Sequence, residues 1–240
     1  MLIVNKNNQS DLFYVFLILG RRSMVMCALK LIIANKNYSS WSFRPWIALK
    51  AKGIEFEEVF SQFNEETGHK HFAEFSPTKK VPVLQDGDLS VWESLAILEY
   101  LAEKFPESGL WPVDVKDRAM ARCISNEMHG GFMSLRAECP MNMRRVEEAI
   151  PVSDGVGKDV KRITNIWREC LKISGGPFLF GEFSNADAMF APVVNRIAKY
   201  KLSDDPIVER YSSAMTALPA WQEWEEAGKA EPWIVEEDEA

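Results

Sequence analysis

The sequence has 240 residues and carries too little positive charge for several classes of function. Lysine and arginine number 28 against 35 acidic residues, which gives a formal net charge of -7. A protein that binds nucleic acid or an anionic membrane surface needs a basic face. We therefore expect neither nucleic acid nor a membrane among its partners.

Cysteine and histidine are also scarce. The 4 cysteines form no CxxC pair and no metal-ligand spacing, which is typical of reduced thiols in a cytoplasmic protein. The 3 histidines, His69, His71 and His129, lack the spacing of a metal site, so no metal is expected. The sequence also lacks a phosphate-binding glycine loop and a nucleophile elbow, so a serine-histidine-acid triad has no support.

Long apolar runs are missing as well. Leu12 to Leu19 is apolar throughout, but a membrane span needs about 20 such residues. A secretory signal is positively charged before its apolar run, whereas Arg21 and Arg22 follow this one. We interpret residues 1–26 as an extension outside the native fold, with an amphipathic anchor or an extra edge strand as alternatives.

Residues 28–106 have the pattern of a small mixed domain. Leu29 to Ala34 is a nearly continuous apolar run, typical of a strand buried on both faces. Asp86-Gly87-Asp88 between two apolar tetrapeptides predicts a β-hairpin. Strands are expected at 29–34, 55–60, 81–84 and 89–92, and helices at 43–53 and 94–105. This order predicts a four-stranded mixed sheet on the thioredoxin-like plan.

The rest of the chain lacks strand patterns. After a linker at 107–115, residues 116–232 are expected to form an all-helical domain, so the whole chain is predicted to be α+β. Its helices are expected at 115–139, 157–174, 184–200, 205–217 and 220–227. Ser184 and Asp187 have the spacing of a capping box.

Hydroxyl groups crowd the loop after the first strand, in the stretch NYSSWSFRPW. Ser42 directly precedes the expected helix start at Phe43, and serine is a preferred N-cap residue. We therefore interpret Ser42 as the helix cap. Ser39 and Tyr38 then remain as hydroxyls available for chemistry.

Four motifs together resemble those of the glutathione S-transferases: SSWSFR after the first strand, KVPVL before the hairpin, ESLAILEYLAEKFP on the next helix and SNADAMFAP later on. The resemblance covers residues 28 to about 230. The serine-led motif is similar to that of the zeta class, Ser-Ser-Cys-Ser-x-Arg, with Trp41 in place of the cysteine and Pro45 after the arginine. A bacterial zeta-like branch fits these differences. The resemblance implies glutathione as co-substrate, a small-molecule electrophile and a homodimer.

The loop would then stabilise the thiolate of glutathione, because only the thiolate is a good nucleophile. A hydroxyl that donates to sulfur and the positive end of a helix both favour that charge. We expect Ser39 to be the donor, with Tyr38 as the alternative, since other transferase classes use a tyrosine here. Arg44 is expected either near the sulfur, in the glutathione site, or in an ion pair between domains.

The resemblance assigns further glutathione contacts. Val81, before a proline expected in the cis form, would pair its backbone with the cysteinyl part. Glu93 would meet the α-amino group of the γ-glutamyl part, and Ser94 with the helix N-terminus its carboxylate. Lys80 would reach the glycyl carboxylate. The alternatives are an edge-strand proline, a solvated glutamate, a serine cap and a surface lysine.

The second substrate is expected in a pocket of the helical domain. His129, Arg136 and Asn142 lie among methionines and a phenylalanine, as in an apolar pocket with a few polar groups. A kinked helix with a surface histidine is an almost equal alternative. If the pocket exists, Arg136 favours an anionic electrophile.

The sequence therefore predicts a glutathione transferase. One alternative is a glutathione-dependent cis-trans isomerase of a maleyl-type diacid. The other is a non-catalytic docking module of the same fold, which would not need the glutathione motifs.

Overall fold

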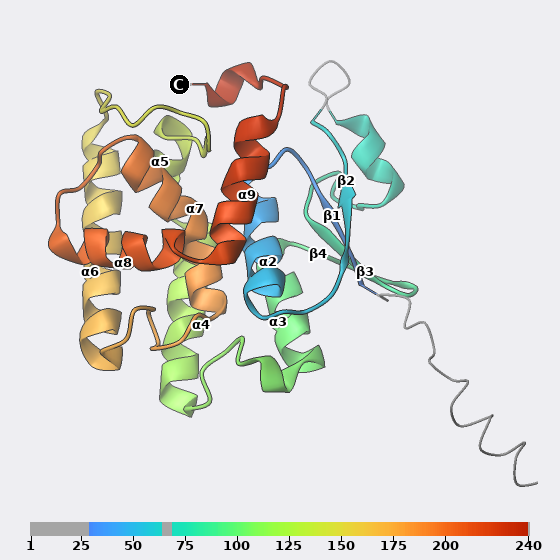
Figure 1. Cartoon of the computed structure of the whole chain (residues 1–240), viewed down its shortest axis with the longest axis horizontal. Helices are drawn as coiled ribbons and strands as arrows, with labels where there is room; N and C mark the ends of the chain where they lie inside the picture. Colours follow the sequence, from blue (N-terminus) through green and yellow to red (C-terminus); the bar gives the residue numbers. More distant parts are fainter. Residues whose placement is uncertain (1–28, 64–68, 240) are drawn as a thin grey trace, which may run out of the picture.

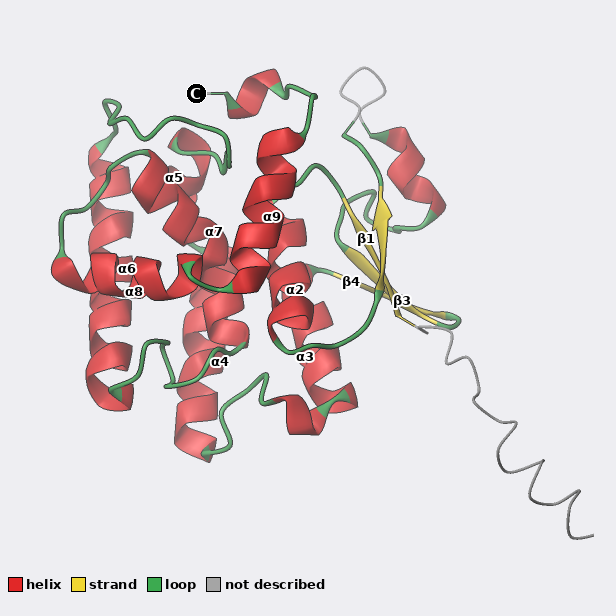
Figure 2. Cartoon of the chain, viewed as in Figure 1, coloured by secondary structure: helices red, strands yellow, loops and turns green. Residues whose placement is uncertain are grey.

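The computed structural model describes residues 29–63 and 69–239, and here a sheet half is followed by a helical half (Figures 1 and 2). The predicted extension at 1–26 lies outside the described residues. The sheet half contains β1 (Leu29–Ile33), α2 (Ser40–Ala51), β2 (Glu57–Phe60), η1 (Lys70–Glu74), β3 (Val83–Asp86), β4 (Leu89–Trp92) and α3 (Ser94–Lys104). The helical half contains η2 (Pro106–Ser108), α4 (Val115–Gly130), α5 (Met133–Glu138), α6 (Asp154–Ser174), α7 (Asn185–Lys199), α8 (Pro206–Thr216), α9 (Pro219–Ala230) and η3 (Glu236–Asp238).

The sheet has the strand order β2-β1-β3-β4, with β1 parallel to β2 and antiparallel to β3. β1 lies inside the sheet, between β2 and β3. Its side chains Leu31 and Ile33 are fully buried. β3 and β4 form the predicted hairpin, in which Asp86 pairs with Leu89 and Gly87 adopts φ 58°. The mixed four-stranded sheet is therefore confirmed.

The predicted helix at 115–139 is wrong, because the chain breaks it at Gly131 and Phe132. Phe132 adopts a left-handed φ of 57° between α4 and α5. A Cβ atom on Gly131 would lie 2.6 Å from the carbonyl oxygen of Glu127, so the backbone crosses here at a distance that only glycine permits. The break turns α5 back toward α6, against which it packs.

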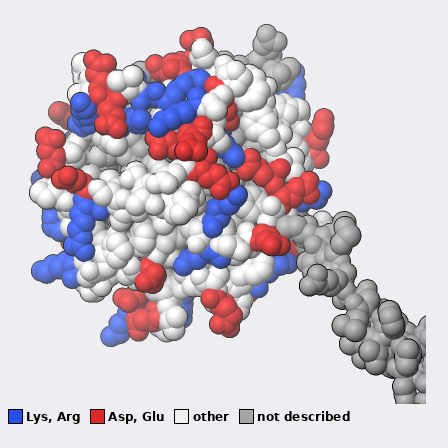
Figure 3. Space-filling model, in the orientation of Figure 1, with Lys and Arg blue, Asp and Glu red and all other residues white. Residues whose placement is uncertain are grey.

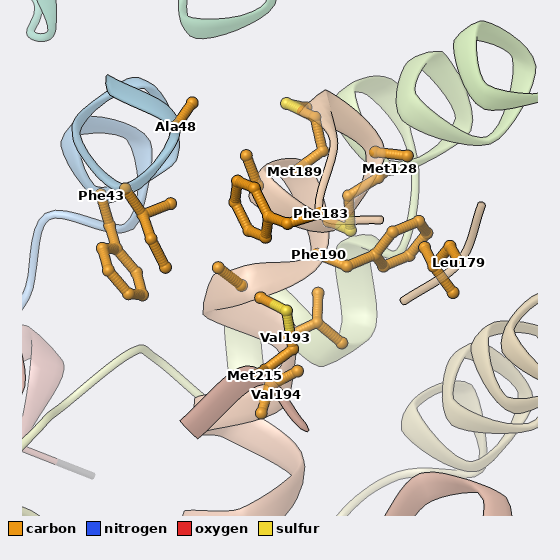
Figure 4. Close-up of a cluster of buried hydrophobic side chains, with 14 of the residues drawn as sticks. Phe43, Ala48, Met128, Leu179, Phe183, Met189, Phe190, Val193, Val194 and Met215 are labelled. Atoms are coloured by element: carbon orange, nitrogen blue, oxygen red, sulfur yellow. The ribbon is translucent and has the colours of Figure 1, made fainter. Parts of the chain in front are cut away.

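Helix α2 joins the two halves, because it packs against both α7 and α9 (Figure 1). Phe43 stacks on Trp224 with ring centroids 4.8 Å apart and meets Trp221 edge-on. Figure 4 shows Phe43 and Ala48 facing a cluster from the helical half that includes Met189 and Val193. This shared core fixes the N-terminus of α2 against the helices.

The chain after α9 returns to the loop between β1 and α2. Glu231 accepts hydrogen bonds from the backbone N–H groups of Lys36 and Asn37, at 2.6 and 3.2 Å. Trp233 stacks on Phe60 at the end of β2, with centroids 5.2 Å apart. The predicted domain end at 232 therefore leaves out part of the packed structure. No helix in the described ranges is long and apolar enough to span a membrane.

Candidate functional site

The site begins at Ser39, which directly precedes α2. The carbonyl of Ser39 accepts the first helical hydrogen bond, from the N–H of Phe43 at 3.1 Å. Its hydroxyl does not cap the helix but donates to Ser42 Oγ at 2.7 Å. The buried Ser39 side chain thus lies at the positive end of the helix.

The prediction that Ser42 caps a helix starting at Phe43 is wrong. The helix starts at Ser40, and Ser42 lies inside its first turn. Ser42 Oγ accepts from the Ala34 N–H at 3.3 Å and so binds the end of β1 to the helix. The helix accommodates Pro45 in its interior.

Tyr38 is buried, and its phenol points to the C-terminal segment. The hydroxyl donates to the Glu239 carboxylate and accepts from the Arg144 guanidinium. It also lies 3.4 Å from the carbonyl oxygen of Trp233. Burial, and next the hydrogen bond to Glu239, raise the pKa of Tyr38 above its ordinary value. These contacts favour Ser39 over Tyr38 as the hydroxyl that is free to turn toward a ligand.

A first cavity of about 190 Å³ lies between α2, the loop before β3, the start of α3, and helices α4 and α5. It is lined by Trp41, Thr78, Lys80, Val81, Pro82, Glu93, Ser94, His129 and Arg136. Four of the expected glutathione contacts, at 80, 81, 93 and 94, thus line the same cavity as two of the expected pocket residues, His129 and Arg136. The Val81-Pro82 peptide is cis.

The first cavity contains polar groups that could bind a ligand. Ser94 Oγ is buried at the N-terminus of α3 and has no hydrogen-bond partner among the described residues. Glu93 adopts φ 70° before this helix, and its carboxylate lies 3.8 Å from His129 Nε2. Burial lowers the pKa of His129, although the charge of Glu93 opposes the shift. These groups suit a zwitterionic ligand, because Ser94 and the helix N-terminus can bind its carboxylate and Glu93 can bind its ammonium group.

A second cavity of about 350 Å³ adjoins the first. Both are lined by Trp41, Lys80, Val81 and Arg136, so a ligand can extend from one to the other. The second cavity also contains Ser39, and its other lining residues are Tyr38, Ser40, Phe63, His69, Phe72, Lys79, Pro140, Met141, Arg196 and Asp238. A molecule bound at Ser94 and Val81 in the first cavity could thus extend into the second cavity, which Ser39 lines.

Trp41 lines both cavities and was not predicted to be a site residue. The guanidinium of Arg136 lies 4.5 Å from its ring centroid and that of Arg44 lies 4.1 Å away. The ring of His129 meets it edge-on at 5.2 Å. The sequence signal was the replacement of a small residue by tryptophan in the motif. Its ring links the two halves at the site.

The structure does not support Arg44 as a glutathione contact. Its Nε donates to the Met189 carbonyl at 3.0 Å and its Nη1 to the Ser40 carbonyl at 3.2 Å. Arg44 lines neither cavity. It is fully buried, and burial, followed by the charges of Arg196 and Arg136, lowers its pKa well below the ordinary value. Arg44 thus joins the two halves through a carbonyl instead of an ion pair.

Asn142 is also misplaced by the pocket prediction. Its Oδ1 accepts from Asn37 Nδ2 at 3.0 Å and from the N–H groups of Arg144 and Arg145. It lines neither cavity. The side-chain amide of Asn142 therefore holds the loop before Ser39 in place, and these hydrogen bonds satisfy its buried polar atoms.

Arg196 was missed. It lies on α7, is only 4% exposed and lines the second cavity. Its Nε donates to the Cys139 carbonyl at 2.9 Å, while Nη1 has no hydrogen-bond partner in the described part of the chain. A charged residue within the buried face of a predicted helix was the available signal. A buried guanidinium with such a donor can bind an anion.

The described residues contain no cluster of histidine, cysteine and acidic groups that could hold a metal ion. The site instead offers hydroxyls, a helix N-terminus and guanidinium groups around an elongated space. Such groups can bind a charged peptide-like molecule, stabilise negative charge on its sulfur and receive an anionic second molecule. The arrangement is therefore suited to thiolate chemistry.

Known proteins agree with this geometry. Residues 24–103 match the glutathione S-transferase N-terminal domain. The chain is 33% identical over 190 residues to maleylacetoacetate isomerase of Rattus norvegicus, which spans 77% of this chain and 87% of that protein. It is 28% identical to a zeta-class glutathione S-transferase of Euphorbia esula, over 77% of this chain and 84% of that protein.

A solved structure supports the fold. A glutathione transferase homologue from Burkholderia, with bound glutathione, has a TM-score of 0.64 and 24% identity, and the match covers 84% of this chain and 97% of that one. The sequence relatives, this shared fold and the motifs at the two cavities give the same assignment. The chain belongs to the glutathione S-transferase family and is a zeta-like transferase with glutathione as its co-substrate.

Proposed function

We propose that the Ser39 hydroxyl stabilises the thiolate of glutathione for attack on an anionic, carboxylated electrophile. Glutathione would lie with its γ-glutamyl end in the first cavity and its sulfur in the second. The observation that carries this proposal is that Val81 lines both cavities. The Ser94 hydroxyl, which has no hydrogen-bond partner among the described residues, lies in one of them, and Ser39 lies in the other.

Charge in the second cavity supports the choice of electrophile. Among the described residues, the lining includes Lys79, Lys80, Arg136 and Arg196, against one acidic residue, Asp238. Burial lowers the pKa of Arg136. Burial also lowers the pKa of Arg196 to about 10, which leaves Arg196 a cation at neutral pH. Buried cations favour a ligand that brings its own negative charge.

A second candidate is cis-trans isomerisation of a maleyl-type diacid, which the rat relative and the cationic cavity both favour. The glutathione thiolate would add to the conjugated double bond. The resulting single bond would rotate, and the thiolate would leave again, so that glutathione is regenerated. A transferase instead keeps the new carbon-sulfur bond, so the products distinguish the two reactions.

We also propose a homodimer and a cytoplasmic location. Exposed apolar side chains of β4 and α4, Leu89, Trp92 and Met120, support a face covered by a second copy. Cys123, Cys139 and Cys170 are all free thiols, which supports a reducing compartment. Light scattering would give the mass in solution, and a monomer at micromolar concentration would refute the dimer.

Calorimetry with glutathione tests the binding site. We expect a single site in the wild type and weaker binding by about tenfold in Ser94→Ala, because the γ-glutamyl carboxylate loses a hydroxyl donor. Ser90→Ala, a change of the same type on β4 outside both cavities, should bind like the wild type. No heat at millimolar glutathione would refute the proposed site.

A further inference from the structure

The last residues of the described chain, 231–239, form a strap across the entrance loop of the site. One end is held by Glu231, whose carboxylate binds the N–H groups of Lys36 and Asn37. Burial raises the pKa of Glu231, while these N–H donors oppose the shift. The strap is therefore anchored to the loop that leads into Ser39.

Arg144 holds the same strap from the helical half. Its Nη1 donates to the Glu231 carbonyl at 2.7 Å, and its Nη2 to the Trp233 carbonyl at 2.6 Å. Asn142 Nδ2 donates to the Asp238 carbonyl at 3.3 Å. These contacts use backbone carbonyls and so fix the path of the strap without engaging the side chain of Asp238. Figure 3 shows basic side chains gathered between acidic ones on the face that Figure 1 views.

The strap brings an acidic side chain to the second cavity. Asp238, on η3, lines that cavity together with Arg136 and Arg196. The charge of Asp238 raises the pKa of Arg196, against the lowering effects of burial and of Arg136. A carboxylate from the protein itself thus faces cations that would otherwise attract one from a ligand.

We propose that Asp238 is the internal counter-charge of the second cavity and that a carboxylated substrate displaces it, loosening the strap. This inference rests on the proposed function, because it concerns the same anion site. Its physical basis is competition, because a ligand carboxylate and the Asp238 carboxylate near the same guanidinium groups repel each other. A bound ligand would therefore favour conformations in which Asp238 lies farther from the cavity. The strap would therefore set the threshold at which an anionic ligand enters.

Binding of a non-reactive dicarboxylate tests the competition. Succinate is titrated into protein saturated with S-methylglutathione, which fills the glutathione site without reacting. In Asp238→Asn we expect succinate to bind about fivefold more tightly, a gain of about 1 kcal/mol. Asn retains the backbone contact to Asn142 and removes only the charge. Glu237→Gln makes the same charge change on the exposed side of η3 and should leave the affinity within about twofold of the wild type.

Hydrogen exchange tests the release of the strap. Succinate should accelerate exchange at the Asp238 and Glu239 amides, which donate to Val235 and Glu236 in the closed strap. Slower exchange would show that the strap closes on the ligand, and unchanged or weaker binding in Asp238→Asn would equally overturn the proposal. Failure of S-methylglutathione to bind would contradict the proposed function separately, because succinate can still be titrated without it.

Discussion

Ser39 donates its hydroxyl hydrogen to Ser42 Oγ across 2.7 Å. The hydroxyl that we expect to contact the glutathione sulfur is thus hydrogen-bonded to another serine. Ser42 Oγ is in turn fixed by the Ala34 N–H. A thiolate is a stronger acceptor than a neutral hydroxyl, since charge-assisted hydrogen bonds are the stronger ones. We therefore expect Ser39 to turn its hydrogen toward the sulfur when glutathione binds, while Ser42 can donate back to Ser39.

Ser39→Ala should raise the pKa of the bound glutathione thiol by about 1 to 2 units. A hydrogen bond to a charged group contributes about 1.5–3 kcal/mol, and one pKa unit corresponds to about 1.36 kcal/mol. A pH titration of the ultraviolet absorbance of the thiolate measures the shift.

Two controls separate this effect from its alternatives. Tyr38→Phe should change the thiol pKa less, because the phenol is already engaged by Glu239 and Arg144. Ser42→Ala should mainly lower the free energy of unfolding, by about 1–3 kcal/mol, because the Ala34 N–H loses its acceptor. If Tyr38→Phe gave the larger pKa shift, the thiolate role would belong to Tyr38.

Stability should depend on pH through His129. Burial lowers the pKa of His129 below the ordinary value of 6.5, so the folded state binds its proton less readily than the unfolded state. The free energy of unfolding should then decrease as the pH falls below about 6.5, until the folded-state pKa is passed. Denaturant melts of the wild type and of His129→Gln over this range should show a shallower decrease in the variant.

Glu93→Gln sharpens this measurement. The Glu93 carboxylate, 3.8 Å from His129 Nε2, favours the protonated histidine. Without it the folded-state pKa of His129 should fall further, and the loss of stability on acidification should become larger than in the wild type. An unchanged loss would show that the two groups do not interact in solution.

The sheet half could be predicted from the sequence because its signals are local. The apolar run of β1, the Asp-Gly turn and the stop at Pro106 each depend on a few adjacent residues. A kinked helix was left open as an alternative here, but the full break at Gly131 was not predicted, because glycine alone did not reveal that the backbone must pass Glu127 so closely. The start of α2 was missed because Ser39, Ser40 and Ser42 have equal capping preference.

The site was predictable only where a motif carries it. Lys80, Val81, Glu93 and Ser94 are near one another in sequence and line one cavity. Arg196 and Asp238 reach the second cavity from α7 and from the strap, so no local pattern joins them to Ser39. Asn142 is a polar residue among methionines, which is typical of a pocket. Its structural role becomes visible only in its hydrogen bond to Asn37, which is distant in the sequence.

Asp187→Ala should lower the free energy of unfolding by at least about 2 kcal/mol. The buried carboxylate completes the predicted capping box with Ser184 and also accepts from the Leu179 N–H and the Tyr211 hydroxyl, each at 3.0 Å. Several buried donors would lose their acceptor together. Asp204→Ala, at a position before α8, should cost much less, and equal losses in denaturant melts would contradict this account.

Arg136→Gln should weaken turnover of an anionic electrophile more than that of a neutral one. Arg136 lines both cavities, and its guanidinium lies over Trp41. Loss of one charged contact to a carboxylate should raise KM for a maleyl diacid roughly tenfold, about 1.4 kcal/mol. KM for a neutral aryl halide should stay within about twofold. Arg168→Gln removes the same charge from an exposed ion pair with Asp205 and should change neither value. Equal losses for both electrophiles in Arg136→Gln would mean that Arg136 acts through its packing on Trp41, because a displaced ring would affect every substrate alike.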